Sequence, residues 1–467
     1  MQIADAKHTV HAGDVRFTFW NSGDLFEISC RDIMINQLLS SPADGSLNNL
    51  YLRLHRPDGI KAQPLIGARA NSRVSIGKRS IAFDGTAFGS IAYRVVFAAD
   101  EAGVWFWDIR VQGRDETIDV ICGQDLGLAA RGAVRSNEAY MSQYIDHKAF
   151  RDARRGYIVC SRQNQPQGGK LPYVQQGCLT GCRGFSTDGF QFFGLSYKAT
   201  NEPEALERES LANEVYQYEF AYTALQSEQV KLDGEARIVF YGLFREDHPE
   251  TVESPEYGEA VEAAWKRYEA GEADAYAPAA PVKPLFPVGE PLQPLPMTEE
   301  EIAEMFPRRV QEERENGQLL SFFTDRYEHV VLREKELRVE RPHGIILMSG
   351  GNDRVTEQVL STTSYMYGVF NSQMTVGNTT FHKFLSNTRN ALNVPKLSGQ
   401  RIFVEMDGVY RMLALPSMFE MGFNYARWTY KLGTDTIVVE NFTASDAPEA
   451  VLRVESLGGK PYRFLVT

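Results

Sequence analysis

Hydrophobic and polar residues alternate along much of the first 250 positions, which is the pattern of half-buried β-strands. One hairpin is indicated over Asp14–Cys30 and a second over Ile91–Val111, each with a short polar turn between its strands. In the second hairpin, Trp105 and Trp107 share a face with aliphatic residues of the same strand. We therefore expect both indole rings to pack in the core of a sandwich and not to form a stacking platform for a ligand.

Further runs with β patterning follow without a helical spacer between them. They are Thr117–Cys122, Tyr157–Cys160, Phe190–Tyr197, Tyr216–Ala224 and Arg237–Phe244. Strands this close together along a chain favour antiparallel sheets over a βαβ fold. Residues 1–250 are thus predicted to form a first β-sandwich domain.

Residues 251–317 are predicted to be a connector of short helices and proline-rich chain. Apolar residues repeat at helical spacing shortly after Ser254, which is a favourable helix cap. Seven prolines then fall between positions 278 and 296, where neither a helix nor a central strand can continue. Thr298 and Glu301 form a capping box that predicts one more short helix.

The strand pattern resumes in residues 318–467, which are predicted to form a second β-sandwich domain. Around Trp428, an aromatic strand, a Gly/Asp turn and an aliphatic strand echo the hairpin at Ile91–Val111. Tyr462–Thr467 has the pattern of a strand, and we expect the polypeptide to be truncated within this domain. The predicted fold is mainly β, with antiparallel β-sandwich or supersandwich units joined by a short helical and Pro-rich connector and no complete (α/α)6 barrel.

The composition is that of a soluble globular protein, with 43% hydrophobic and 24% charged residues. The formal net charge of −12 disfavours a nucleic-acid partner. We see no secretory signal and no run long enough to span a bilayer, so a cytoplasmic protein without a membrane partner is expected. Five cysteines are too few for a disulfide framework, and Cys178 and Cys182 lack a second Cys/His pair for zinc, which favours free thiols.

Motifs for nucleotide binding, zinc-dependent hydrolysis and serine hydrolysis are missing from the sequence. Carboxylates are plentiful, so a glycosidase-like pair remains possible by count alone. The aspartates nearest to the polar stretch described next are expected to be turn or solvent-facing residues more often than a catalytic acid. They are Asp119, Asp125, Asp146 and Asp188.

Two polar clusters combine tyrosine, glutamine, asparagine and glycine, a mixture that suits a neutral polyhydroxylated ligand such as a sugar. In the first cluster, Asn137–Gly184, the candidates are expected on loops, where they either contact a ligand or are ordinary polar loop residues. These candidates are Tyr140, Gln143, Tyr144, Gln163, Asn164 and Gln175. In the second cluster they are Tyr365, Asn371, Gln373, Asn378 and His382, although a lone histidine is more often structural than catalytic.

At these clusters the chain resembles the N-terminal β region of the glycoside phosphorylases of glycoside hydrolase family 94. Within that family it is most similar to the 1,2-β-oligoglucan phosphorylases, and the similarity runs along nearly all of the chain. The motifs that carry the resemblance are GQDLGL at 123–128, NEAYMSQYIDHKAF at 137–150, GYIVCSRQNQPQGGKLPYVQQGCL at 156–179 and SYMYGVFNSQMTVGNTTFHKFLSNTRN at 364–390.

The resemblance implies reversible phosphorolysis of a β-1,2-glucan, in which inorganic phosphate attacks the anomeric carbon with inversion and α-glucose 1-phosphate leaves. It implies no metal or organic cofactor, with phosphate as co-substrate, and a homodimeric full-length enzyme. In that family the catalytic acid sits on a helical barrel that follows the β region. No residue of this chain is expected to be catalytic, because its patterning is β almost to the last position.

Three other functions remain open from the sequence: a stand-alone carbohydrate-binding supersandwich protein, a complete hydrolase or lyase of sugars, and a β-1,2-glucan synthase. The synthase is disfavoured because such chains carry membrane segments, and we see no run in this sequence that is long enough to span a bilayer.

Overall fold

The computed structural model of the chain describes residues 7–41, 45–136, 138–218, 220–272, 274–280, 290–350, 356–377 and 399–467. Contacts divide the chain into two compact units. The first comprises Met1–Gly194 and Pro203–Val288, and the second comprises Leu195–Glu202 and Gly289–Thr467. The two helices of the predicted connector belong to different units, α5 (Gly258–Ala270) to the first and α6 (Glu299–Met305) to the second.

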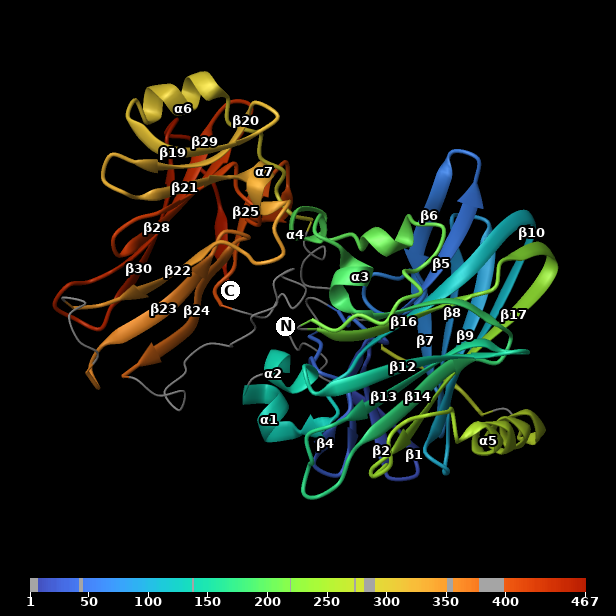
Figure 1. The fold of residues 1–467 in the computed structure, drawn as a ribbon. Coiled ribbons are helices and arrows are strands. Elements are labelled where there is room, and N and C mark those ends of the chain that lie inside the picture. Colours follow the sequence, from blue (N-terminus) through green and yellow to red (C-terminus); the bar gives the residue numbers. More distant parts are fainter. Residues whose placement is uncertain are drawn as a thin grey trace. The chain divides into compact units, whose positions relative to one another are not determined.

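The first unit consists mainly of strands (Figure 1). Its strands are β1 (Lys7–Ala12), β2 (Val15–Trp20), β3 (Leu25–Cys30), β4 (Ile33–Met34), β5 (Asn49–Arg56), β6 (Gly59–Pro64), β7 (Ser72–Ile76), β8 (Ser80–Ala87), β9 (Ile91–Asp100), β10 (Val104–Asp125), β11 (Ala129–Ala130), β12 (Ile145–Asp152), β13 (Gly156–Gln163), β14 (Tyr173–Cys178), β15 (Cys182–Asp188), β16 (Ala221–Ser227), β17 (Val230–Arg245) and β18 (Ala277–Pro278). Its helices are α1 (Arg131–Ser136), α2 (Glu138–Ser142), α3 (Gly189–Phe193), the 3₁₀ helix η1 (Glu204–Leu206) and α5.

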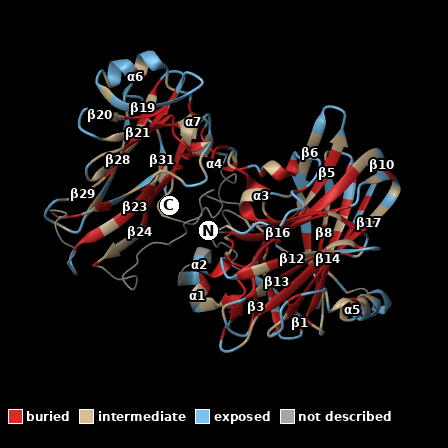
Figure 2. Ribbon diagram, in the orientation of Figure 1, coloured by how far each residue is buried: buried red, intermediate tan, exposed pale blue. Residues whose placement is uncertain are grey.

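The core of the first unit lies between a five-stranded sheet, β1-β2-β3-β4-β11, and a thirteen-stranded sheet. The alternation in β2 turns Phe17 toward β9 and β10, where its ring centroid lies 4.8 Å from that of Phe97 and 5.1 Å from that of Trp105. Trp107 is buried against the same cluster. Both predicted hairpins and the core position of both indoles are confirmed, and Figure 2 shows the buried strands in red.

Part of the larger sheet closes on itself, which the sequence did not predict. The pairings run β10-β17-β14-β13-β15-β16 and return from β16 to β10, so six strands form a closed barrel. The parallel contact between β13 and β15 is a single pair, Gly156 with Cys182. Gly156 has a φ of +72°, and a Cβ there would lie 2.0 Å from the carbonyl oxygen of Cys182, so closure at this point requires glycine.

Two details of the first unit correct the expectations. Phe190–Tyr197 is not a strand but contains α3 and the start of α4 (Tyr197–Thr200), because Asp188 and Gln191 form a capping box at the start of α3. The helix expected after Ser254 is confirmed as α5, but it starts at Gly258 without a side-chain cap. Its Trp265 packs on Phe106 of β10 at 5.1 Å, which fixes α5 against the outer face of the sheet.

The described residues of the second unit form one seven-stranded sheet, β19-β20-β21-β27-β28-β29-β30, and two three-stranded sheets, β22-β23-β24 and β26-β25-β31. Its strands are β19 (Arg309–Glu315), β20 (Gln318–Thr324), β21 (His329–Leu332), β22 (Gly344–Met348), β23 (Leu360–Tyr365), β24 (Val369–Val376), β25 (Ile402–Met406), β26 (Val409–Met412), β27 (Met418–Met421), β28 (Tyr425–Lys431), β29 (Thr436–Thr443), β30 (Ala450–Ser456) and β31 (Phe464–Val466). Its helices are α4, α6 and α7 (Arg333–Glu336).

Aromatic residues of the large sheet form the core of the second unit. Trp428 of β28 is fully buried and packs against Phe370 at 4.6 Å and Phe419 at 5.0 Å. The predicted hairpin at β28 and β29, the final strand and the capping box of Thr298 with Glu301 are confirmed. The fold class is therefore mainly β, as predicted, and the described residues contain no (α/α)6 barrel.

Candidate functional site

An exposed pair of tyrosines lies at the end of α2. Tyr140 on the helix and Tyr144 just after it are 45% and 37% exposed. Their rings meet edge to face at 5.1 Å, and the Tyr144 hydroxyl donates a hydrogen bond to the Tyr140 hydroxyl at 2.9 Å. This hydrogen bond raises the pKa of Tyr144, so its hydroxyl keeps its proton at physiological pH.

A second aromatic segment, residues 214–218, has no regular secondary structure and is held by side chains of β15 and α3. Thr187 bonds both the amide and the carbonyl of Tyr216, at 2.9 and 2.6 Å. Asp188 accepts from the amide of Tyr218 at 2.9 Å while its other oxygen accepts from the amide of Phe190. The ring of Tyr218 then rests against Phe190 at 4.6 Å, which fixes the direction of this segment.

Gln217 joins the two segments. Its side-chain amide donates to the carbonyl of Gln143 at 2.8 Å and to that of Ile145 at 2.5 Å. The large hydrophobic side chains that are exposed in the described part of the first unit all belong to these segments: Tyr140, Tyr144, Val215 and Tyr216. We call this patch, with Gln143 and Gln217, the tyrosine surface.

The tyrosine surface offers flat aromatic faces beside amide groups and carries no charged group among the residues that define it. Such a surface can stack on and hydrogen-bond to a neutral sugar, and it supplies no acid, base or nucleophile. Among the described residues, no group of His, Cys, Asp and Glu could hold a metal ion.

The structure brings four of the six candidates of the first cluster together: Tyr140, Gln143, Tyr144 and Asn164. The amide of Asn164 donates to the carbonyl of Tyr144 at 2.8 Å, and its side chain accepts from Arg162. Gln143 and Asn164 are exposed. Whether any of these residues contacts a ligand stays a prediction.

The predicted loop positions of Gln163 and Gln175 are wrong. Both lie in strands, at the end of β13 and in the middle of β14, and neither side chain is exposed. Gln163 donates to the carbonyl of Met141 at 3.2 Å and so supports the end of α2. Gln175 accepts from the hydroxyl of Tyr173 at 3.0 Å in the cluster beneath α5. Their amides are paired inside the protein and out of reach of a sugar.

The described residues of the second cluster lie on β23 and β24, where Tyr365 and Asn371 take part in packing. Tyr365 stacks on Tyr367 at 5.3 Å, and its carbonyl accepts from the indole of Trp428 at 3.0 Å. Asn371 is buried, donating to Gln400 and accepting from Asn441, both at 2.7 Å. Gln373 is placed in β24, whereas Asn378 and His382 lie outside the described residues.

Three of the four aspartates expected in turns or facing solvent are instead buried: Asp119, Asp125 and Asp188. His55 and Arg53 together hold the pKa of Asp119 below the ordinary value despite burial, and Arg53 donates two hydrogen bonds to it, at 2.7 and 2.6 Å. Burial raises the pKa of Asp125 to about 6, while amides of residues 37 and 38 hold its carboxylate. All three are engaged in structure, and Asp146 is half-buried.

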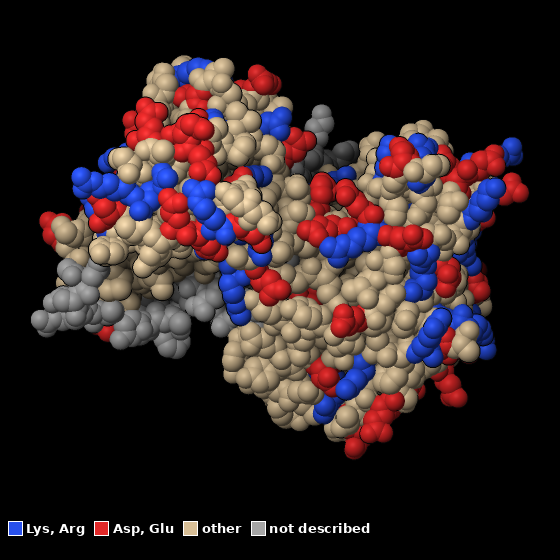
Figure 3. Space-filling view, turned by 45° about the horizontal axis from the view of Figure 1, so that its top comes forward, with Lys and Arg blue, Asp and Glu red and all other residues tan. Residues whose placement is uncertain are grey.

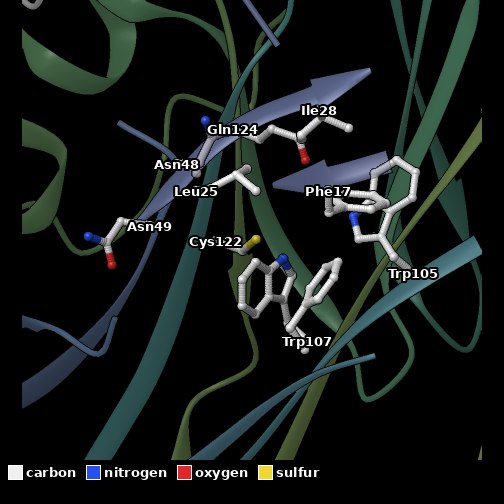
Figure 4. A pocket seen from close by; sticks show the side chains of 11 residues that line it. Phe17, Leu25, Ile28, Asn48, Asn49, Trp105, Trp107, Cys122 and Gln124 are labelled. Atoms are coloured by element: carbon white, nitrogen blue, oxygen red, sulfur yellow. The ribbon is translucent and has the colours of Figure 1, made fainter. Parts of the chain in front are cut away.

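A small enclosed cavity lies in the core of the first unit. Figure 4 shows Phe17, Trp107 and Cys122 turned toward it. Its volume is about 10 Å³, which is near the least that one water molecule needs and far too small for a sugar. The five cysteines are buried and free.

Sequence reasoning missed Tyr216, Gln217 and Tyr218, which it assigned to a strand. The run EVYQYEF at 214–220 combines tyrosine and glutamine, as the first cluster does, and this composition was the signal that could have identified the segment.

Figure 3 shows Lys and Arg side chains interspersed with Asp and Glu, and no extended basic patch on the face in view. No helix in the described part of the chain is long and apolar enough to cross a membrane.

Comparison with known proteins gives two family matches in sequence order. Residues 18–242 match the SOGP N-terminal domain, and residues 306–467 match the glycoside phosphorylase supersandwich domain. The chain is 39% identical over 458 residues to a 1,2-β-oligoglucan phosphorylase of Listeria innocua serovar 6a. The alignment covers 98% of this chain but 41% of that relative, so the chain spans less than half of the relative's length.

Solved structures give weaker similarities. A polysaccharide lyase aligns with 94% of this chain and 48% of its own, at 8% identity and a TM-score of 0.32. A galactose 1-epimerase from Lactobacillus acidophilus NCFM aligns with 52% of this chain and 95% of its own, at 9% identity and a TM-score of 0.28. At these scores neither structure bears on the function of this chain.

Proposed function

Because the chain belongs to the glycoside phosphorylases whose N-terminal and supersandwich domains it matches, we propose that it is the N-terminal β region of an enzyme that phosphorolyses β-1,2-glucan oligosaccharides. The observation that carries the proposal is 39% identity along 98% of the chain to a 1,2-β-oligoglucan phosphorylase. Sequence identity at this level over both domains supports the same role for them in this chain as in the relative.

In the proposed reaction, phosphate oxygen forms a bond to the anomeric carbon of the terminal glucose while the glycosidic C–O bond breaks. The leaving sugar oxygen takes a proton from a carboxylic acid, and α-glucose 1-phosphate is released. We propose that the acid and the phosphate site lie on a helical barrel outside these 467 residues, and that no metal or organic cofactor takes part. This chain alone is then inactive.

The chain's own contribution would be to border the sugar pocket through the tyrosine surface. Its support is chemical: the exposed aromatic rings lie beside amides, and Thr187, Asp188 and Gln217 hold the backbone that carries them. We further propose that the complete enzyme belongs to glycoside hydrolase family 94, is cytoplasmic and forms homodimers.

The experiment compares the chain alone with the chain fused to the part of the Listeria relative that lies beyond the matched region. Both are supplied with sophoro-oligosaccharides, with and without inorganic phosphate. We expect glucose 1-phosphate from the fusion with phosphate, and none from the chain alone. Release of reducing sugar by the chain alone without phosphate would instead identify a hydrolase, and glucan binding with an inactive fusion would favour a carbohydrate-binding protein.

A further inference from the structure

A second open surface of the first unit is a groove between α5 and the outer face of β9, β10 and β17. Its floor includes Val96 and Ala98 on β9, and its walls include Tyr268 of α5 and the segment 274–276 that follows the helix. The volume is about 1240 Å³, which exceeds the range usual for a site that encloses one small ligand. A groove of this size has room for an extended ligand.

Arginines cross the floor of this groove in a row of neighbouring strand positions. Arg94 of β9 is opposite Arg110 of β10, which is opposite Arg237 of β17. Each guanidinium has a carboxylate partner: Arg94 has Asp84 at 2.9 Å, and Arg237 has Asp108 at 2.8 Å. Arg110 lies 3.9 Å from Glu235. The pairs of Arg94 and Arg237 hold planar donors and acceptors in place before any ligand arrives.

Aromatic rings stand beside this row. The hydroxyl of Tyr268 donates to Asp108 at 3.1 Å, so its ring direction is fixed. Tyr276 is held by a hydrogen bond between its hydroxyl and that of Ser80 at 2.8 Å, and the Arg94 guanidinium lies 5.4 Å from the centre of its ring. Asp274 accepts from the Ser80 hydroxyl at 2.5 Å and so ties the wall to β8.

The charges that line the groove nearly cancel. It is lined by five arginines and six carboxylates, for a formal charge of −1 with His11 neutral. An anion such as a phosphorylated sugar would meet one more carboxylate than guanidiniums and gain nothing from the local field. A neutral ligand with many hydroxyls can use both donors and acceptors and can stack its apolar ring face on an aromatic side chain.

We propose that this groove is a second, non-catalytic binding site for an uncharged oligosaccharide of several sugar units. The proposal deepens the proposed function and rests on it for the identity of the sugar, a β-1,2-glucan. The site shares no residue with the tyrosine surface, so the two can be separated by substitution. A glucan held here would stay close to the enzyme between turnovers.

The test measures the affinity of the 467-residue chain for sophoro-oligosaccharides by calorimetry, with inorganic phosphate as a separate probe. Loss of one stacking ring is expected to weaken glucan binding about tenfold in Tyr276→Ala. Val96→Trp fills the floor and leaves the walls in place, so it should weaken binding as much. Tyr327→Ala, which removes a 71% exposed ring in the second unit, is the matched control and should bind as the unchanged chain does.

Each outcome has a consequence. Equal affinity of Tyr276→Ala, Val96→Trp and the unchanged chain overturns the groove site, and so does absence of glucan binding by the unchanged chain. Loss of binding in Tyr144→Ala alone would place the sugar on the tyrosine surface and overturn this site while supporting the proposed function. Conversely, the fusion enzyme could be inactive while the groove variants still weaken glucan binding. That result would contradict the proposed phosphorylase function and support the groove as a binding site.

Discussion

The ammonium group of Lys198 lies 3.8 Å from the carboxylate of Glu336, and neither side chain is exposed. Lys198 also donates to the carbonyls of Glu336 and Val339, at 2.5 and 2.9 Å. Glu336 in turn accepts from the ring and the amide of His343, at 2.6 and 3.1 Å. This network fixes Leu195–Glu202, which lies between two parts of the first unit in the sequence, within the second unit.

Replacing Lys198 by Met should destabilise the second unit. Burial lowers the pKa of Lys198, but removing the ammonium leaves a buried carboxylate without its cation, which costs about 3 kcal/mol or more. Hydrogen exchange of peptides from α7 and β27–β28 measures the effect, with Lys460→Met on the exposed surface as control. The double variant Lys198→Met/Glu336→Leu should recover much of the loss, and a double variant as unstable as the single one would contradict this account.

Gly156→Ala should destabilise the barrel of the first unit by about 3 kcal/mol or more, because a side chain at positive φ must also displace a backbone oxygen. Urea unfolding followed by tryptophan fluorescence measures it, since four of the five tryptophans belong to the first unit. Gly168→Ala is the matched control: its φ is +59°, but nothing lies within 4 Å of the added Cβ. If both variants lose equal stability, the contact with Cys182 contributes nothing.

His147 should make the first unit less stable in acid. Burial lowers its pKa from 6.5 to about 4, so between these values the unfolded chain binds a proton that the folded chain does not. Stability from this group is present above pH 6.5 and is lost as the pH falls toward 4, by up to about 3 kcal/mol. The His147→Gln variant lacks this loss. The difference between the two proteins in the free energy of unfolding, measured with urea, should therefore become smaller from pH 7 to pH 4.

The comparison with the variant is needed because Asp125 acts in the opposite direction. Its raised pKa of about 6 means that the folded chain binds the proton more tightly, so its contribution decreases as the pH rises. Asp125 is present in both proteins and cancels in the difference. A gap that stays constant with pH would show that His147 is not excluded from protonation in the folded state.

Local patterns predicted the hairpins, Trp105 and Trp107 in the core of the first unit, and the capping box of α6, because each depends on residues close together in sequence. Closure of the barrel could not be predicted, since it rests on strand pairs far apart in the chain and on one glycine contact. Polar composition was a poor guide to exposure for Gln163 and Gln175. In the sequence, a glutamine whose side chain is buried and hydrogen-bonded looks the same as a glutamine that faces a ligand.

The tyrosine surface gives the remaining prediction, which concerns the complete phosphorylase. In the fusion enzyme, Tyr144→Ala should raise KM for sophoro-oligosaccharides about fivefold through the lost ring face, with kcat unchanged because the surface supplies no reacting group. Tyr144→Phe loses the hydrogen bond to Tyr140 but keeps the ring, so its KM should lie closer to that of the unchanged enzyme. Tyr327→Ala controls for removal of an exposed tyrosine elsewhere. A fall in kcat at constant KM would mean that Tyr144 acts on the reacting atoms, and unchanged kinetics would remove the tyrosine surface from the sugar pocket.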